Sequence, residues 1–584
     1  MKRRQVITML KTLLAQVKEY KKASILTPVF AVLEVFMEVL IPFLMAKVID
    51  EGIGKGNVSY AVKMGLLMFV MAVLSLTFGV LAGRFGALAS SGFARNLRKS
   101  MFENIQTFAF SNIDKYSTAG LVTRMTTDVT NLQNAYQMIL RMCTRAPVTL
   151  ICALSMTIMI NAKLSSVFLV AIVVLGAALV FIVTQAFPLF NKMFTKYDNL
   201  NAGIQENVNA IRVVKSYVRE DHEISKLQKA CAELCLFSMK AERIVCMNTP
   251  IMQLTVYGCM LSISWFGAQL VVSSSMTTGQ LMSMFTYVMN ILMSLMMLSM
   301  IFVMLTMSKA SMERIAEILN EKADIVNPEN PVKEVADGSI EFEHVNFAYR
   351  KDSRNVLKDI NVKIHSGETI GIIGGTGGSK STFVQMIPRL YDVAEGSVSV
   401  GGVNVKNYDL DTLRNEVSMV LQKNVLFSGT IKENLRWGNP DATDEQIEHV
   451  CKLAQADEFI QTFPDKYDTW IEQGGTNVSG GQKQRLCIAR ALLKKPKILI
   501  LDDSTSAVDT RTDAMIRKAF REEIPDTTKL IIAQRISSVQ DADRIIVLEE
   551  GQINGMGTHE ELLESNAIYR EVYESQVKGG QEDE

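Results

Sequence analysis

A long stretch without ionisable residues limits what this chain can fold into. Between Ile244 and Ser308 the sequence has no Asp, Glu, Lys, Arg or His. That length accommodates two membrane-spanning helices of about 20 residues each. The polar segment SSSMTTGQ around Ser273 marks a turn between them. The stretch therefore predicts two helices in a lipid bilayer.

Four further segments complete a set of six spans within residues 23–312. Two of them, Met64–Gly83 and Leu164–Asn191, have no charged residue, and Ala146–Ile160 is a shorter run that needs its flanks to reach span length. Ser24–Val48 supplies the first span. A hydrophobic content of 48% and a mean hydropathy of +0.16 agree with a membrane portion.

The loops between these spans differ in length and charge, and this difference predicts the orientation. Arg84–Asn134 and Lys192–Arg243 are long and basic, whereas Asp50–Tyr60 and Asn161–Lys163 are short. The positive-inside rule places the long loops in the cytoplasm, so six spans put both termini there, in a multi-pass protein of the plasma membrane. Residues 1–22 predict an amphipathic helix in the cytoplasmic interface, with one apolar face made of Ile7, Leu10, Leu14 and Val17.

The first and last spans carry candidates for a substrate cavity. Glu34 and Glu38 share one face of a helix, and carboxylates are costly in hydrocarbon. They either pair with a basic side chain of another helix or form a cation-selecting wall. The last span holds nine methionines between Met282 and Met307. These residues either line a tolerant apolar cavity, with Met289, Met293 and Met297 as candidates, or pack against lipid and protein.

The overall charge and the cysteines exclude other classes of protein. Lys+Arg and Asp+Glu are both 61, so nothing indicates a nucleic-acid partner, and a soluble ATPase of DNA-repair type is excluded by the charge-free spans. The eight cysteines are scattered without the paired spacing of a zinc site. We expect reduced thiols.

After the last span the composition changes to that of a soluble domain. Residues 313–337 are charged and lose helical periodicity at Pro328 and Pro331, which predicts a linker. Strand-like and helical segments then alternate over residues 338–578, before a short tail at 579–584. This order predicts a mostly parallel α/β domain.

A glycine-rich turn in this domain has the sequence context of a phosphate loop. A buried strand ending at Ile373 leads into GGTGGSKST, and a helix follows. Backbone N–H groups at the start of a helix bind phosphate, so the turn predicts ATP binding. The residues concerned are Gly374, Gly375, Thr376, Gly377, Gly378, Ser379, Lys380, Ser381 and Thr382. Ser379 departs from the pattern G-x-x-x-x-G-K-[ST], which has glycine just before the lysine.

A second strand end supplies the expected Mg²⁺ ligand. The apolar run Ile498–Leu501 brings Asp502 to the carboxyl edge of the sheet, where ligands collect in such folds. Ser381 and Asp502 are the predicted Mg²⁺ partners of the bound nucleotide.

Between these two elements lies NVSGGQKQRLCIARALLKKPK, where a helix begins after Ser-Gly-Gly-Gln. The chain here resembles the ATP-binding cassette (ABC) family, and the resemblance covers essentially its whole length. It implies that the signature turn Ser479, Gly480, Gly481 and Gln482 caps the γ-phosphate of an ATP held by a second cassette. It also implies that Tyr349 stacks on adenine, that Gln422 links Mg²⁺ to the membrane region, and that the loop Ser506–Asp509 crosses the dimer.

Two positions depart from the family where its catalysis requires them. The family places a glutamate after the strand aspartate, and this chain has Asp503; the family's switch histidine is replaced by Gln534. The carboxylate of Asp503 is one carbon nearer the backbone, a displacement on the order of 1.5 Å. The signature turn is intact. We therefore expect a heterodimer whose second, non-identical chain supplies the glutamate and histidine.

The resemblance is to heterodimeric bacterial multidrug exporters, which implies ATP-driven export of amphipathic compounds across the plasma membrane, in contact with membrane lipid. By the same resemblance, short helices near Ser117–Thr123 and Asn209–Lys215 dock on cassettes. The alternatives are a lipid or peptide exporter of the same architecture and an ATP-gated membrane protein that does not transport. An importer is disfavoured because the spans are fused ahead of the cassette.

Overall fold

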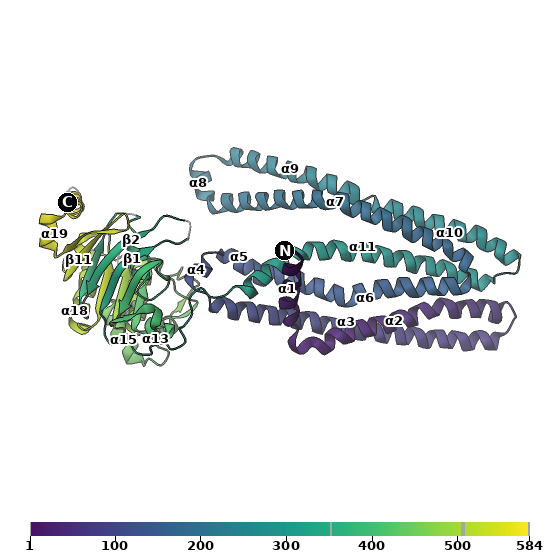
Figure 1. The fold of residues 1–584 in the computed structure, drawn as a ribbon, viewed down its shortest axis with the longest axis horizontal. Coiled ribbons are helices and arrows are strands. Elements are labelled where there is room, and N and C mark those ends of the chain that lie inside the picture. The colour runs from purple at the N-terminus through teal and green to yellow at the C-terminus, as the bar shows by residue number, and fades with distance from the viewer. Residues whose placement is uncertain (1, 351–352, 376, 504–507, 582–584) are drawn as a thin grey trace. The chain divides into compact units, whose positions relative to one another are not determined.

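The computed structural model describes residues 1–584 except 1, 351–352, 376, 504–507 and 582–584 (Figure 1). It consists of two compact units. The helical unit comprises Met1–Gln106 and Thr118–Glu321, and the α/β unit comprises Thr107–Ser117 and Lys322–Glu584. We describe each unit by itself.

The helical unit contains six helical stretches, among the described residues, that are long and apolar enough to cross a membrane. The six predicted spans are thereby confirmed. The stretches are Lys18–Ile53, Val58–Gln106, Thr118–Ile160, Ala162–Asn209, Glu220–Val272 and Thr278–Leu298. The helices of this unit are α1 (Lys2–Ala15), α2 (Lys21–Lys47), α3 (Val58–Gln106), α5 (Thr118–Thr123), α6 (Val129–Ile160), α7 (Ala162–Asn209), α8 (Ile211–Ser216), α9 (Glu220–Val245), α10 (Asn248–Val272) and α11 (Thr278–Asn320), with short helical segments at Lys18–Tyr20, Val48–Ile53 and Arg124–Asp128. Helices α1 and α8 lie outside the six stretches.

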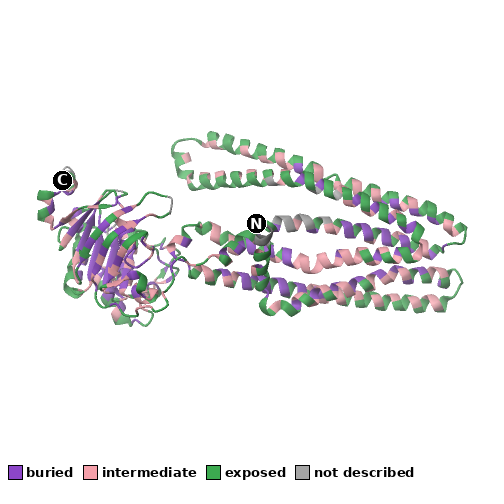
Figure 2. Cartoon of the chain, viewed as in Figure 1, coloured by how far each residue is buried: buried purple, intermediate pink, exposed green. Residues whose placement is uncertain are grey.

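Buried and exposed residues alternate along these helices (Figure 2). Tyr287 of α11 is fully buried and donates a hydrogen bond of 2.8 Å to the carbonyl of Val39 on α2, which joins the first and last spans. Large apolar side chains such as Leu66 and Phe69 of α3 lie exposed on the outside. An exterior of this kind suits lipid rather than water, because apolar patches of this extent are rare on soluble monomers.

The last span extends further than the sequence predicts. Helix α11 continues to Asn320, so the first part of the predicted linker 313–337 is helical and belongs to the helical unit. The part of α11 that extends beyond the predicted span is held by Asp128, which is 1% exposed. Arg314 Nε donates to Asp128 Oδ2 at 2.7 Å, and the Ser311 hydroxyl donates to Oδ1 at 2.8 Å. An ion pair and a hydrogen bond to another element therefore hold a helix where the local sequence looks like a linker.

The α/β unit contains two main sheets. The six-stranded sheet has the order β12-β11-β3-β10-β9-β6, and all its neighbours are parallel except β11 and β12. The antiparallel sheet has the order β2-β1-β4-β5, and β7 pairs with β8. The strands are β1 (Ile340–Phe347), β2 (Leu357–Ile364), β3 (Thr369–Ile373), β4 (Glu395–Val400), β5 (Val403–Asn404), β6 (Val417–Val420), β7 (Gly429–Thr430), β8 (Trp470–Ile471), β9 (Ile498–Asp502), β10 (Thr528–Ile532), β11 (Arg544–Glu549) and β12 (Gln552–Gly557).

Helices cover this sheet, and the last of them continues into the predicted tail. The predicted α/β domain, with a mostly parallel main sheet, is confirmed, and α20 extends into residues 579–584 as far as Gln581. The helices of this unit are α4 (Phe110–Ile113), α12 (Lys380–Gln385), α13 (Leu410–Glu416), α14 (Ile431–Leu435), α15 (Asp444–Leu453), α16 (Asp457–Thr462), α17 (Gly480–Leu492), α18 (Thr510–Glu523), α19 (His559–Ser565) and α20 (Ala567–Gln581).

A piece of the first long loop belongs to the α/β unit. Helix α4 packs through the Phe110 ring, which lies edge-on to Tyr391 with centroids 6.0 Å apart. The Tyr391 hydroxyl donates to Asp114 Oδ2 at 2.7 Å, and burial together with this bond raises the pKa of Tyr391. The part of this loop that belongs to the α/β unit is thus Thr107–Ser117, and α5 (Thr118–Thr123), the predicted docking helix, begins directly after it in the helical unit. The docking of α5 on a cassette stays a prediction.

We predict that removing the Asp128 carboxylate destabilises the helical unit. Asp128→Ala leaves a guanidinium half-buried without its partner, at a cost of about 2–3 kcal/mol, below the value for a fully buried pair because the side chain of Arg314 is 46% exposed. The thermal unfolding midpoint measures the loss. Asp128→Ala combined with Arg314→Met should recover part of it. Glu313→Ala, which removes an exposed ion pair with Lys309, should have almost no effect; equal losses in both single variants would contradict the assignment.

Candidate ATP-binding site and membrane cavity

The parallel strands bring the predicted nucleotide residues to one edge of the sheet. Ile532 of β10 pairs with Ile372 of β3 on one side and with Asp502 of β9 on the other. The neighbouring β6 ends at Val420, just before Gln422. The phosphate loop, Asp502, Gln534 and Gln422 therefore all follow the carboxyl ends of adjacent strands, where ligands bind in open α/β sheets.

The phosphate loop approaches its neighbours so closely that glycine is needed at its start. A Cβ on Gly374 would lie 2.1 Å from the Leu548 carbonyl oxygen. Lys380, the first residue of α12, donates from Nζ to the carbonyls of Gly374 and Gly375 at 2.7 and 2.9 Å. Burial lowers the pKa of Lys380, and the nearby carboxylates oppose this shift. The predicted residue Thr376 lies outside the described residues.

Ser379 adopts the left-handed conformation that favours glycine. Its φ is 67° and its ψ is 20°, at the N-cap of α12. A side chain in this region costs about 1 kcal/mol or more, because the Cβ approaches the following carbonyl oxygen. The departure from the phosphate-loop pattern therefore places a strained residue directly before Lys380.

Ser381 and Asp502 meet beside this loop. The Ser381 hydroxyl donates to Asp502 Oδ1 at 2.9 Å. Asp502 is 3% exposed, and burial raises the pKa of its carboxyl, with a further contribution from Asp503. A hydroxyl and a carboxylate are oxygen ligands of the type that Mg²⁺ prefers. The chemistry of the two residues fits the predicted ion, and Gln422 stands exposed at the end of the adjacent strand.

The two residues that depart from the family contact each other. Gln534 Nε2 donates a hydrogen bond of 2.8 Å to Asp503 Oδ2. Asp503 also has a left-handed φ of 51°, and its backbone N–H donates to the Ile532 carbonyl at 3.1 Å. The Asp503 carboxylate is thus positioned by the Gln534 amide.

Tyr349 lies next to the helix that follows the phosphate loop. Its hydroxyl is 2.9 Å from the Thr382 hydroxyl, and its ring is 47% exposed. The Tyr391 ring stands edge-on to it, with centroids 5.2 Å apart. Tyr391 also contacts the segment Thr107–Ser117, so one aromatic side chain touches both this segment and the predicted adenine residue. Sequence reasoning missed this residue, because Tyr391 belongs to no motif.

The signature turn forms the N-cap of α17. The Gln482 N–H donates to the Ser479 hydroxyl at 3.3 Å, and the Ser479 N–H donates to Gln482 Oε1 at 2.9 Å. This reciprocal capping leaves Ser479 and Gly480 exposed. Asp509 caps α18, whereas residues 504–507, including Ser506 of the predicted crossing loop, lie outside the described residues.

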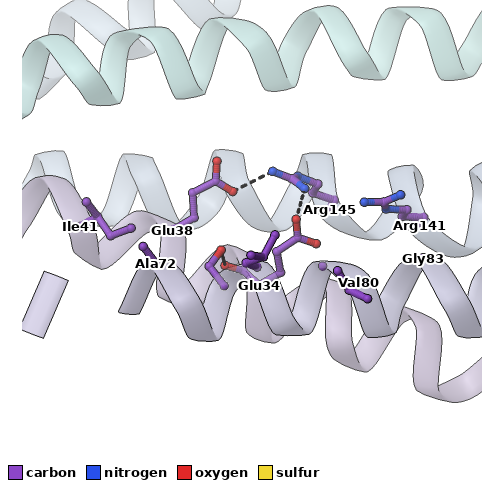
Figure 3. A pocket seen from close by; sticks show the side chains of 11 residues that line it. Glu34, Glu38, Ile41, Ala72, Val80, Gly83, Arg141 and Arg145 are labelled. Carbon is purple, nitrogen blue, oxygen red and sulfur yellow. Dashed lines mark hydrogen bonds and ion pairs between the residues drawn. The ribbon is translucent and has the colours of Figure 1, made fainter. Parts of the chain in front are cut away.

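In the helical unit, Glu34 and Glu38 both contact one arginine. Arg145 of α6 donates from Nη1 to Glu34 Oε1 and from Nη2 to Glu38 Oε2, the latter at 2.8 Å. The three residues line a cavity of about 630 Å³ between α2, α3 and α6, together with Arg141 and apolar side chains (Figure 3). Glu34 and Glu38 therefore both form ion pairs with Arg145, and both also line a cavity.

The predicted methionines do not line this cavity. Met289 and Met293 are exposed and Met297 is partly exposed on α11, while the cavity is lined from the other three helices. Sequence reasoning also missed Arg141 and Arg145. Their spacing of four residues matches that of the two glutamates, and this was the available signal.

Comparison with known proteins agrees with this organisation. A model of the ABC transporter transmembrane region matches residues 24–296, and an ABC transporter model matches residues 357–506. The chain is 36% identical to an uncharacterized ABC transporter ATP-binding protein, YfiB, of Bacillus subtilis, over 96% of this chain and 98% of the relative. It is 30% identical to the putative multidrug export ATP-binding/permease protein YgaD of Bacillus subtilis, over 95% and 97%. It is 31% identical to an ATP-dependent lipid A-core flippase of Desulfotalea psychrophila, over 87% and 88%.

Six membrane-spanning helices followed by a nucleotide-binding α/β domain define an ATP-driven membrane transporter. The chain belongs to the ABC transporter family, and it is a half-transporter of the exporter type, with one membrane region and one ATP-binding domain.

We predict that Ser379→Gly stabilises the α/β unit by about 1 kcal/mol, because glycine adopts a positive φ without Cβ strain. The affinity for ATP should rise by up to about fivefold, which corresponds to the same free energy. Thermal unfolding and equilibrium binding of a fluorescent ATP analogue measure the two effects. Ser379→Ala keeps the Cβ and should gain neither; a gain equal to that of glycine would assign the effect to the hydroxyl instead.

Proposed function

We propose that this chain is one subunit of a heterodimeric exporter of amphipathic compounds, and that its own phosphate-loop site binds Mg²⁺-ATP but hydrolyses it poorly. Its signature turn then acts on the ATP held by a second, non-identical half-transporter. In this arrangement the protein lies in the plasma membrane, with both termini and the ATP-binding domain in the cytoplasm.

The contact between Gln534 and Asp503 is the observation that supports this proposal best. A catalytic carboxylate in this reaction orients the attacking water, and such catalysis depends on position. Here one oxygen of a shortened carboxylate accepts a hydrogen bond from an amide at 2.8 Å. The Gln534 amide cannot carry the charge of an imidazolium near the γ-phosphate. Asp503 and Gln534, the two residues that depart from the family pattern, contact each other. Restoring only one of them therefore leaves the catalytic site incomplete.

The side chains expected to contact the phosphates and Mg²⁺, in contrast, are retained, and Ser379 is the one departure within the phosphate loop. Lys380 begins a helix behind a glycine-rich turn, and Ser381 and Asp502 form a hydroxyl–carboxylate pair. Binding without efficient hydrolysis is the combination that these residues favour. A site of this kind holds ATP across several turnovers and keeps two cassettes associated, while the second site opens and closes.

An intact signature turn gives the reason for a partner. Ser479 and Gly480 are exposed at a helix N-terminus, a position that favours phosphate. The turn is useful only opposite a phosphate loop that binds ATP productively. We therefore infer that the partner has the glutamate and histidine that this chain lacks.

The cargo is inferred from the membrane region and its relatives. Relatives are named for multidrug export and for lipid A-core flipping, and both names describe amphipathic molecules. The cavity that contains Glu34 and Arg145 combines charged and apolar walls, which suits such molecules.

We predict that the purified full-length chain alone hydrolyses ATP at least about 100-fold more slowly than its complex with the partner, because loss of catalytic positioning costs this much. Asp503→Glu alone should change the rate little, since Gln534 remains. Asp503→Glu with Gln534→His should restore turnover. ATPase of the four preparations, measured side by side, tests the proposal, and rapid turnover by the unmodified chain alone would reject it.

A further inference from the structure

We infer that the cavity between α2, α3 and α6 binds a zwitterionic head group, with its anion on Arg141 and its hydrogen-bond donor on Glu34. This inference names the substrate class of the exporter and so rests on the proposed function. It replaces the expectation of a cation-selecting wall, because the structure shows that both carboxylates already contact a guanidinium.

Two buried polar atoms in this cavity are without a hydrogen-bond partner among the described residues. One is Oε2 of Glu34, and the other is Nε of Arg141. Glu34 is 8% exposed, and Figure 3 shows its second oxygen on the side of Arg141. Leaving a buried donor or acceptor unpaired costs about 1–3 kcal/mol, more for charged groups. Both atoms have less than 1 Å² of accessible surface, so a ligand in the cavity pairs with them only when neighbouring side chains shift.

The arginine side chain is the group available to an anion. Arg145 divides its Nη atoms between Glu34 and Glu38, whereas Arg141 makes no ion pair in the part of the chain that the structure describes. A guanidinium presents several N–H donors in one plane and binds carboxylate or phosphate with two hydrogen bonds. An anionic group entering the cavity would meet Arg141.

The charge balance of the cavity decides between cations, anions and zwitterions. Two glutamates and two arginines are the ionisable residues that line it, so its formal charge is zero. A ligand with a net charge would leave an uncompensated charge within the membrane region, and such charges are expensive there. A zwitterion leaves the sum at zero while satisfying both Glu34 and Arg141.

The other walls suit the apolar part of an amphipathic ligand. Ile41, Leu76 and Val80 line the cavity, and Leu76 and Val80 are exposed on the outer side of α3. Glycine on α3 leaves room for the Glu34 carboxylate, because a Cβ on Gly79 would lie 3.0 Å from Glu34 Oε1. A volume of about 630 Å³ lies in the range of small-molecule sites.

The test is equilibrium binding of tritiated lysophosphatidylethanolamine to the full-length chain, reconstituted with its partner in nanodiscs without nucleotide. Competitors with a hydrocarbon chain of matched length separate the charges: lysophosphatidic acid is an anion, an alkyltrimethylammonium is a cation, and lysophosphatidylcholine is a zwitterion without an N–H donor. We expect the ethanolamine lipid to bind best and the anionic and cationic compounds at least about tenfold more weakly. Preferential binding of the cation would overturn the inference. Dileucine is a zwitterion but not a lipid. Competition by dileucine would show that the ligand of this cavity need not be a lipid.

Variants assign the site to its residues. Arg141→Gln should weaken binding at least about tenfold and shift the preference toward the cation, and Arg141→Lys should retain most of the affinity. Glu34→Gln should shift the preference toward the anion. Arg84→Gln is the matched control, because Arg84 lies exposed on α3 outside the cavity. Unchanged affinity in Arg141→Gln would overturn the inference even if Glu34→Gln fails to fold.

Binding without nucleotide keeps this test independent of hydrolysis. A chain that binds the zwitterion but hydrolyses ATP rapidly alone would contradict the proposed function and leave the cavity assignment intact. A complex that hydrolyses ATP as proposed, but binds the head group no better than its Arg141→Gln variant, would contradict only the cavity assignment.

Discussion

The parallel pairing of β3, β10 and β9 is the constraint on which the nucleotide site depends. Side chains far apart in the sequence meet because three buried strands end at the same level. The strand β9 brings Asp502 to Ser381, and one residue further the chain turns with a left-handed Asp503 that Gln534 contacts. The sheet therefore fixes both the retained binding residues and the altered catalytic ones. A change in the register would displace them together.

A different constraint acts in the membrane, where charges must be compensated nearby. Glu34 and Glu38 are retained in an apolar helix because Arg145 neutralises part of their charge, and Arg141 balances the remainder. The arrangement is a compact cluster that leaves one donor and one acceptor unused. The same physical requirement that stabilises the helix pair also defines which ligands the cavity accepts. The two inferences, on ATP and on cargo, thus arise from separate parts of the molecule.

Much of this could be predicted from the sequence, because the informative signals are local. Charge-free runs predict the membrane spans. The glycine-rich motif and the apolar run before Asp502 predict where the phosphate loop and the Mg²⁺ ligand lie in the sequence. Contacts between distant residues could not be predicted in this way. No local pattern joins both Glu34 and Glu38 to the single residue Arg145, or pairs Phe110 with Tyr391, because these contacts depend on tertiary packing. Ser379 combines a local and a non-local signal. The sequence shows that serine replaces the glycine of the phosphate-loop pattern, but only the structure shows that this serine adopts a left-handed backbone conformation.

The central claim is that this chain's site retains ATP while the partner's site hydrolyses it. Identifying the nucleotide bound to each chain tests this claim most directly. The complex would be incubated with Mg²⁺ and 8-azido-ATP labelled at either the α- or the γ-phosphate, and photocrosslinked after several turnovers. The account predicts that this chain carries both labels, because its ATP is intact, whereas the partner carries mainly the α-label. Loss of the γ-label from this chain at the partner's rate would contradict the account.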